Sequence, residues 1–420
     1  MNSADSLLKS QAVNFKNITA GILGFLVVAF FFGFNFFGNA RLFWLLLDLG
    51  IFMFLLFLPL DGLGRLLTLR YTLIALILLF FQFLLFAINL LINEIETISF
   101  IKYYYYIRVI PFLIMLLVLR KNYPGVMKKV LDFIFYISVF SLVINSLYMM
   151  RQARGVHNMD DVDGFFGSAA THSLSFCWLI FLGFLRYRKK YSFGIILPVI
   201  LYMLFLSILA ESKTFIAFVF IYIIIVVFQK KMSLMSKVFF IIFTTVVVSI
   251  ASVTAYLTVP DITTYVDNNL LKWGLNQYMR SNDDEATGSE REAMIRTSVS
   301  DPNAFLFGNG IGCVSEAFGF QGYKRWRENV HFGMIDMSAI IYEGGILFYL
   351  ILISLMAVLL DNFFPGVSYW RLFLIFFFLN VLFWYSKILS DPREMVASVF
   401  IFIVYGHYLE ESPSSGEQKK

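Results

Sequence analysis

The segment Ser289-Glu290-Arg291-Glu292 combines a helix-start signal with a guanidinium group. Ser289 and Glu292 have the spacing of a capping box, which predicts that a helix begins here. Arg291 would then lie in the first turn, beside unpaired N–H groups and the positive end of the helix dipole. Such a position suits a phosphate group. The alternative is an exposed arginine paired with Glu292 or with a lipid headgroup.

A second cation, Lys213, lies two residues after the acidic Glu211 in a short polar connection. Because apolar residues flank this connection on both sides, we expect the pair at a membrane boundary. An ionisable pair in that position marks a functional site or an internal ion pair. A lysine that merely extends its ammonium group to the interface is the alternative interpretation.

His331 is the best candidate for a general base, because an ordinary histidine has a pKa near neutrality. A structural role is the alternative. The histidines lack the spacing of a metal site, and so do the two cysteines, Cys177 and Cys313. We therefore expect neither a metal nor another cofactor. The four histidines are His157, His172, His331 and His407.

The chain that carries these residues is too apolar for a soluble protein. Of its 420 residues, 59% are hydrophobic and only 15% are charged, whereas a soluble domain needs more polar surface. Apolar runs of about 18–25 residues recur, which is the length of a membrane-spanning helix. The sequence predicts an all-α, polytopic membrane protein of about twelve transmembrane helices. The expected spans are 18–37, 42–60, 73–92, 103–119, 130–150, 171–185, 192–209, 214–228, 238–257, 335–360, 371–388 and 393–409.

These spans divide the chain into four regions. Residues 1–257 hold spans one to nine, 258–334 form a long external loop with short helices, 335–409 hold spans ten to twelve, and 410–420 form a polar tail. With the long loop set aside, 18 basic residues fall on the side of the termini and 8 on the other side. Basic residues favour the cytoplasmic side, so both termini are expected there. The net charge of +5 does not indicate nucleic-acid binding, because the basic residues lie in short connections beside spans.

Polar residues inside apolar spans predict hydrogen bonds between helices. The run Tyr103–Tyr106 is expected to form an aromatic belt at a span end. In the long loop, Asp301-Pro302 and the glycine-rich segment 308–312 predict turns. The polar residues inside spans are Asp48, Gln82, Asn89 and Asn145.

Three stretches, in this order, resemble the O-antigen polymerase and ligase superfamily. Asp163-Gly164-Phe165-Phe166-Gly167 is similar to the family's outer Gly-Phe segment before a span. Glu211-Ser212-Lys213-Thr214 is similar to its Ser-Arg-Thr-like turn, with lysine where arginine is usual. The third stretch has the order of the family's long loop: an arginine, a glycine-rich turn, a histidine, then Glu-x-Gly at the next span. Its members are Arg291, Phe307-Gly308-Asn309-Gly310-Ile311-Gly312, His331 and Tyr342-Glu343-Gly344-Gly345.

The resemblance implies a glycosyltransferase of the bacterial inner membrane that acts at the periplasmic face without metal. An undecaprenyl-diphosphate-linked glycan would be transferred to the hydroxyl of a second acceptor. Arg291 and Lys213 would bind the diphosphate and stabilise charge on the leaving group, and His331 would orient or deprotonate the acceptor. Besides membrane lipid, a chain-length regulator and a flippase are the implied partners. Supporting residues on the same face are Glu211, Arg154, His172, Asp336 and Glu343.

Three functions remain open at this point. A polymerase is favoured, because no asparagine follows His331 and because Asp336 makes this segment acidic, as in the polymerases of the family. A ligase that transfers finished glycan to lipid A–core would share the same motifs. A twelve-span secondary transporter is indicated by Asp61-Gly62-Leu63-Gly64-Arg65, although such carriers have their longest loop inside.

Overall fold

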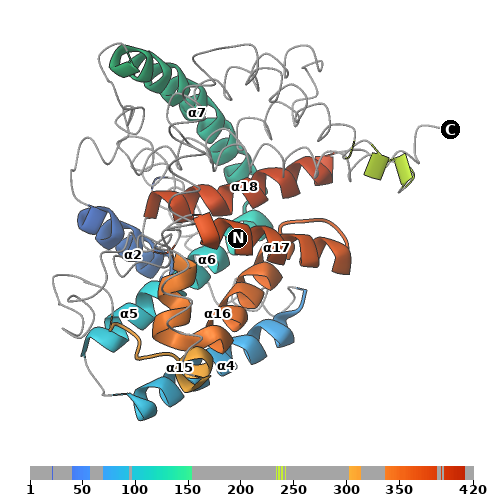
Figure 1. Cartoon of the computed structure of the whole chain (residues 1–420). Helices are drawn as coiled ribbons and strands as arrows, with labels where there is room; N and C mark the ends of the chain where they lie inside the picture. Colours follow the sequence, from blue (N-terminus) through green and yellow to red (C-terminus); the bar gives the residue numbers. More distant parts are fainter. Residues whose placement is uncertain are drawn as a thin grey trace, which may run out of the picture.

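The computed structural model describes residues 40–56, 70–93, 97–153, 302–313, 336–385 and 392–411, together with Gly21, Leu389 and six positions between 233 and 242. Every regular element in these ranges is a helix (Figure 1), which confirms the all-α expectation for this part of the chain. The helices are α2 (Ala40–Leu56), α4 (Thr72–Ile92), α5 (Thr97–Ile107), α6 (Val109–Asn122), α7 (Pro124–Ala153), α15 (Pro302–Phe307), α16 (Asp336–Asp361), α17 (Tyr369–Tyr385) and α18 (Pro392–Glu411).

Three stretches of the described chain are long and apolar enough to cross a membrane: Thr72–Ile92, Thr97–Asn122 and Asp336–Asp361. The expectation of membrane-spanning helices is confirmed at this level. Helices α2, α7, α17 and α18 overlap four further expected spans. The expected spans 18–37, 171–185, 192–209, 214–228 and 238–257 lie outside the described residues, apart from a few isolated positions.

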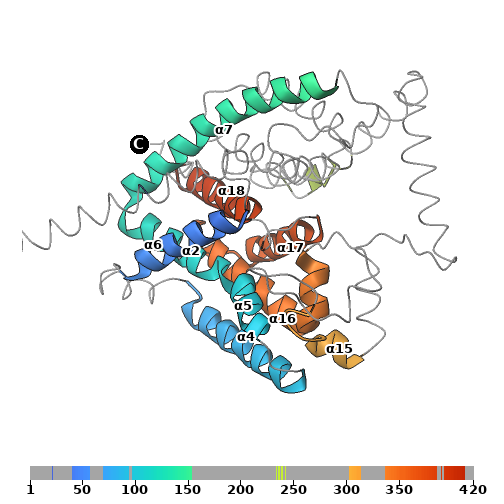
Figure 2. The same ribbon diagram turned by 90° about the vertical axis from the view of Figure 1, so that its left-hand side faces the viewer.

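Helix α16 is the centre of this arrangement. It packs against α4, α6, α15, α17 and α18, and Figures 1 and 2 show it between α4 and α17. Of its most apolar window, 72% is buried in the protein, compared with 22% for α4. Helix α4 therefore buries only a narrow face in the protein. That narrow face consists of Gln82, Phe86 and Asn89, whose spacing puts them on one side of a helix.

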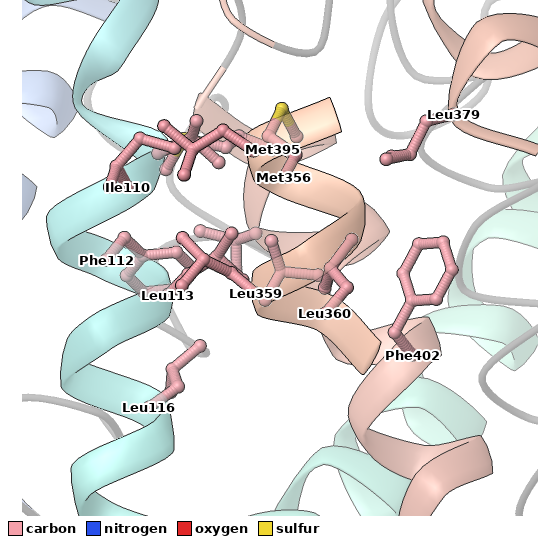
Figure 3. Close-up of a cluster of buried hydrophobic side chains, with 14 of the residues drawn as sticks. Ile110, Phe112, Leu113, Leu116, Met356, Leu359, Leu360, Leu379, Met395 and Phe402 are labelled. Atoms are coloured by element: carbon pink, nitrogen blue, oxygen red, sulfur yellow. The ribbon is translucent and has the colours of Figure 1, made fainter. Parts of the chain in front are cut away.

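The interior between these helices is apolar and closely packed. Figure 3 shows side chains of α6 directed toward Met356, Leu359 and Leu360 of α16, with side chains of α17 and α18 beyond them. In a membrane, lipid tails are as apolar as leucine, so such contacts stabilise the fold through close packing rather than through removal of apolar surface from water. The labelled residues of α6 are Ile110, Phe112, Leu113 and Leu116.

The stretch from Thr97 to Asn122 is interrupted at Arg108, between α5 and α6. Pro111 accounts for the interruption, because its ring has no N–H for the carbonyl of Ile107 and collides with that carbonyl in a regular helix. The hydrogen bond from Phe112 N to Arg108 O is also long, at 3.4 Å. The break leaves the Arg108 side chain fully buried inside the protein.

Helix α16 is interrupted as well, at Gly345, whose φ of 84° and ψ of 165° are not helical. A φ in this range favours glycine. The backbone of the segment after α15 lies directly against this break: a Cβ on Gly345 would overlap the carbonyl of Leu306, and a Cβ on Gly308 would overlap the carbonyl of Glu343. Both positions therefore require glycine for two reasons, backbone conformation and close approach.

We expect Gly308→Ala and Gly345→Ala each to destabilise the protein by at least about 2 kcal/mol, because backbone strain adds to steric overlap. The measurement is the thermal unfolding midpoint of purified protein in detergent. Gly125→Ala is the matched control, since a Cβ there would meet nothing within 4 Å and alanine favours helix. A midpoint for Gly308→Ala as high as that of Gly125→Ala would contradict the described contact.

Candidate functional site

The structure describes two of the eight residues that the sequence singled out, Asp336 and Glu343. Both lie in the first part of α16 and both are buried. The other six lie outside the described residues: Arg291, His331, Lys213, Glu211, Arg154 and His172. The geometry that follows therefore concerns the part of the long-loop motifs that begins at the glycine-rich segment.

The glycine-rich segment forms a turn, as the sequence predicts. Helix α15 begins at Pro302, where a proline suits the first helical position because it lacks the N–H that would otherwise be unpaired there. The turn itself depends on Gly308, Gly310 and Gly312, whose φ angles are 81°, 114° and 96°. These values lie in the region that residues with a side chain rarely adopt.

This turn supplies hydrogen-bond donors to the broken part of α16. In an unbroken helix the carbonyls of Tyr342 and Glu343 would accept hydrogen bonds from residues four positions later. Instead, Asn309 N donates to Tyr342 O over 2.9 Å, and Gly310 N donates to Glu343 O over 3.1 Å. The turn thus replaces the backbone N–H donors that these carbonyls lose because the helix is interrupted at Gly345. Such replacement is needed because an unpaired carbonyl inside a membrane costs several kcal/mol.

Asn89 of α4 joins the turn and α16 with a single side chain. Its Nδ2 donates to the carbonyls of Phe307 and Glu343 over 2.6 and 3.0 Å, and its Oδ1 accepts from Ile311 N over 2.9 Å. The prediction that Asn89 bonds between helices is confirmed. Gln82, on the same face of α4, is fully buried, and in the described structure neither of its amide atoms has a hydrogen-bond partner.

The Glu343 carboxylate completes the connection between α5, the turn and α16. Its Oε2 accepts a hydrogen bond of 2.5 Å from the hydroxyl of Tyr106 and one of 3.1 Å from Gly312 N. Glu343 is completely buried from solvent and Tyr106 almost completely. We refer to residues 308–313 with Asn89, Tyr106 and Glu343 as the turn cluster.

Asp336, seven residues and nearly two helical turns before Glu343, has a related contact. Its carboxylate accepts a hydrogen bond from Leu389 N, and Nη2 of Arg108 donates to the carbonyl of the same residue over 3.0 Å. The guanidinium of Arg108 also lies 3.9 Å from the ring centre of Tyr105, a cation–π contact. Asp336 and Arg108 together hold the peptide between α17 and α18 against α5 and α16.

The turn cluster has the chemistry of a rigid support. The hydrogen bonds to Glu343 and Asp336 come from buried protein donors, which fix the position of the backbone. Burial, together with the nearby Glu343 carboxylate, raises the pKa of the Cys313 thiol well above its usual value, so this cysteine is a poor nucleophile. Among the described residues, no three His, Cys, Asp or Glu side chains lie close enough to hold a metal ion.

Lys102 lies beside the turn cluster, against the ring of Tyr106. Its side chain is almost completely buried, and its ammonium group lies 5.1 Å from the ring centre of Tyr106. It also interacts electrostatically with Cys313. A lysine inside an apolar helix is costly unless it has such contacts, so the position of Lys102 depends on the turn cluster.

Sequence reasoning missed the role of Tyr106. The interpretation of Tyr103–Tyr106 as an aromatic belt is wrong for Tyr103 and Tyr106, which are buried. The helix begins at Thr97 rather than at the expected residue 103, so these tyrosines lie deeper than a span end. The signal that was available is the pair Lys102 and Arg108 on either side of the run, because two cations in an apolar helix need internal partners.

Comparison with known proteins does not add a family to this geometry. No family model matches the sequence, and no curated protein matches it. The candidate site accordingly rests on the residues of the chain and on their contacts.

Tyr106→Phe should lower the free energy of unfolding by about 1–3 kcal/mol, because the Glu343 carboxylate loses a buried donor. Tyr369→Phe is the matched control, since Tyr369 is 77% exposed. Thermal unfolding of both variants in the same detergent tests the expectation. Equal midpoints for the two variants would show that the hydroxyl of Tyr106 does not support the turn cluster.

Proposed function

We propose that this protein is an integral-membrane glycosyltransferase that polymerises undecaprenyl-diphosphate-linked repeat units into O-antigen- or capsule-type polysaccharide. The observation that carries the proposal is the contact between the glycine-rich turn and the Glu343-Gly344-Gly345 segment, through Gly308, Gly345 and the carbonyl of Glu343. In the sequence these are two separate motifs of the long loop that resembles the O-antigen polymerase and ligase superfamily. Direct contact between them gives a physical reason for both to occur in one chain.

The proposal places Arg291 and His331 on either side of this support. Arg291 precedes the start of α15 by 11 residues, and His331 precedes Asp336 by 5 residues. Since an extended chain spans at most about 3.3–3.6 Å per residue, His331 lies within roughly 18 Å of Asp336. His331 is therefore tethered close to the end of α16 at which the turn cluster lies, and Arg291 is joined to α15 by 11 residues, at most roughly 40 Å of chain.

The proposed reaction needs two cations and one base. The hydroxyl oxygen of the acceptor sugar attacks the anomeric carbon of the donor, the bond from that carbon to the phosphate oxygen breaks, and undecaprenyl diphosphate leaves. Arg291 and Lys213 stabilise the negative charge that develops on the leaving diphosphate. His331 takes the proton of the attacking hydroxyl. The turn cluster holds the loop that carries Arg291 and His331.

The proposed orientation puts the turn cluster at the periplasmic face and both termini in the cytoplasm, with twelve spans in total. The described helices support it through their basic residues. Arg70, Arg120 and Arg371 lie at the end of α16 opposite the turn cluster, where they contact residues 361–366. Basic residues favour the cytoplasmic side of a membrane, which leaves the turn cluster on the periplasmic side.

Purified wild-type protein supplied only with undecaprenyl-diphosphate-linked repeat units should produce a ladder of longer lipid-linked glycans, with or without a chelator. Arg291→Ala, Lys213→Ala and His331→Ala should each lower the rate about 100- to 1000-fold, because one preorganised contact to the transition state is lost. Lys213→Arg should retain part of the activity. Gel analysis of the lipid-linked products measures the outcome.

Arg296→Ala is the control for this assay, since it removes an arginine of the same loop that the proposal does not use. Full activity of Arg291→Ala would contradict the assignment of the diphosphate site. If wild-type protein makes no ladder but transfers finished glycan to added lipid A–core, the protein is a ligase and the polymerase proposal is wrong.

Reporter fusions test the orientation separately from the chemistry. Fusions at Asp160 and Asp284 should be active only with a reporter that requires the periplasm, and a fusion at Lys189 only with one that requires the cytoplasm. This pattern follows from the distribution of basic residues. The reverse pattern would place Arg291, Lys213 and His331 on the side of the membrane where the flipped substrate is absent.

A further inference from the structure

A cluster of charged residues lies at the end of α16 opposite the turn cluster. Asp361, the last residue of α16, is fully buried. Arg371 of α17 donates hydrogen bonds to both carboxylate oxygens of Asp361, with Nε 2.6 Å from Oδ1 and Nη2 3.1 Å from Oδ2. Arg70, just before α4, has Nη1 3.5 Å from Oδ2 of the same carboxylate. Two guanidinium groups thus share one carboxylate, which leaves an excess of positive charge.

The backbone after Asp361 draws a third arginine into this arrangement. Arg120, in the last turn of α6, donates a hydrogen bond to Phe363 O. We refer to Arg70, Arg120, Arg371 and Asp361 as the arginine cluster, in which Arg70 and Arg371 bring two positive charges to the single carboxylate of Asp361. Arg70 and Arg371 donate to further carbonyls of the same segment, those of Phe364, Pro365 and Gly366.

An apolar groove of about 270 Å³ lies between α16 and α17 next to the arginine cluster. Val358, which lines it, is one helical turn before Asp361, and Tyr369, which also lines it, is two residues before Arg371. Figure 2 shows the two helices side by side. The groove is lined by Ser354, Ala357 and Val358 of α16 and by Tyr369, Phe373 and Phe376 of α17. Its walls are suited to a hydrocarbon chain rather than to a polar ligand.

Aromatic residues mark the level of this end in the membrane. Tyr369 and Trp370, the first residues of α17, are 77% and 57% exposed. Exposed tyrosine and tryptophan at the end of an apolar helix are typical of the headgroup level of a bilayer. Phe373 and Phe377 continue the exposed face of α17 away from this end. Positive charge, interfacial aromatic rings and an apolar groove therefore follow one another from the headgroup level toward the bilayer interior.

We infer that this end of the protein binds an anionic glycerophospholipid, with the headgroup at the arginine cluster and one acyl chain in the groove between α16 and α17. The charge of the arginine cluster selects the headgroup: a lipid with a net negative charge is attracted, whereas the cationic ammonium group of a zwitterionic lipid offsets that attraction. The groove explains why the ligand is a lipid rather than a soluble phosphate. Neither argument depends on the glycosyltransferase proposal.

Native mass spectrometry of the purified full-length protein in detergent tests the inference. Palmitoyl-oleoyl phosphatidylglycerol should bind at least about fivefold more tightly than the phosphatidylcholine with the same acyl chains. Arg70→Gln should weaken phosphatidylglycerol binding about fivefold, whereas Arg70→Lys, which keeps the charge, should retain it. Soluble glycerol phosphate should not displace the bound lipid.

The groove is tested with Phe373→Ala, which removes part of its wall at a position that is 54% exposed and therefore leaves the core intact. This variant should also bind phosphatidylglycerol more weakly, by at least about threefold for one lost apolar contact surface. Phe80→Ala on α4 is the matched control. Phe80 is 62% exposed and has an aromatic neighbour, Phe81, as Phe373 has in Trp370. Equal affinity for the two lipids, or equal affinity of Phe373→Ala and Phe80→Ala for phosphatidylglycerol, would overturn the inference.

Discussion

The structure depends most on how the carbonyls at the break in α16 are satisfied. A helix normally supplies its own hydrogen-bond partners, which is why helices can cross a bilayer. At Gly345 this supply stops inside an apolar segment. The N–H groups of Asn309 and Gly310 and the amide of Asn89 replace it. The position of the turn against α16 and the burial of Glu343 both follow from that replacement.

The two ends of α16 solve the same problem with opposite chemistry. At one end, the carboxylates of Glu343 and Asp336 accept hydrogen bonds from backbone N–H groups. At the other end, arginines donate to backbone carbonyls of residues 361–366. Irregular backbone is tolerated at Gly345 because it is buried in protein, whereas Pro365 and Gly366 at the other end are exposed. At Gly345 the carbonyls of Tyr342 and Glu343 accept hydrogen bonds from the turn.

Length and apolarity were enough to predict the helices, because both follow from the thickness of a bilayer. Proline at the starts of α7, α15 and α18, which are Pro124, Pro302 and Pro392, agrees with its preference for the first helical position. The starts of α7 and α15 were not predicted, because a span start was expected at residue 130 and a turn at Asp301-Pro302. The early start of α5 at Thr97 was not predicted either, because Lys102 interrupts the apolar run five residues after the helix begins. The ammonium group of Lys102 lies over the ring of Tyr106, one turn later in the same helix, so this contact is local to α5.

For the site, the sequence identified the glycine-rich turn and Glu343 but not what connects them. Glycines predict a turn through their conformational freedom, which is a local property. The bond from Tyr106 to Glu343 joins residues 237 positions apart, and nothing local to either residue encodes the pairing. Arg291, Lys213 and His331 were selected by charge, by pKa and by resemblance, which are properties of single residues and short motifs. Their mutual geometry lies outside the described residues.

The hydrogen bond from Asn89 to the carbonyl of Glu343 spans 254 residues of sequence, and this separation matters while the chain is being made. A polytopic protein enters the membrane span by span, so α4 is inserted long before α16 has been synthesised. Until then the Asn89 amide lacks one of its two carbonyl partners, that of Glu343, and the N–H groups of Asn309 and Gly310 lack theirs. A chain that stops before residue 336 therefore leaves polar groups of α4 and of the turn without the partners that α16 supplies in the finished protein.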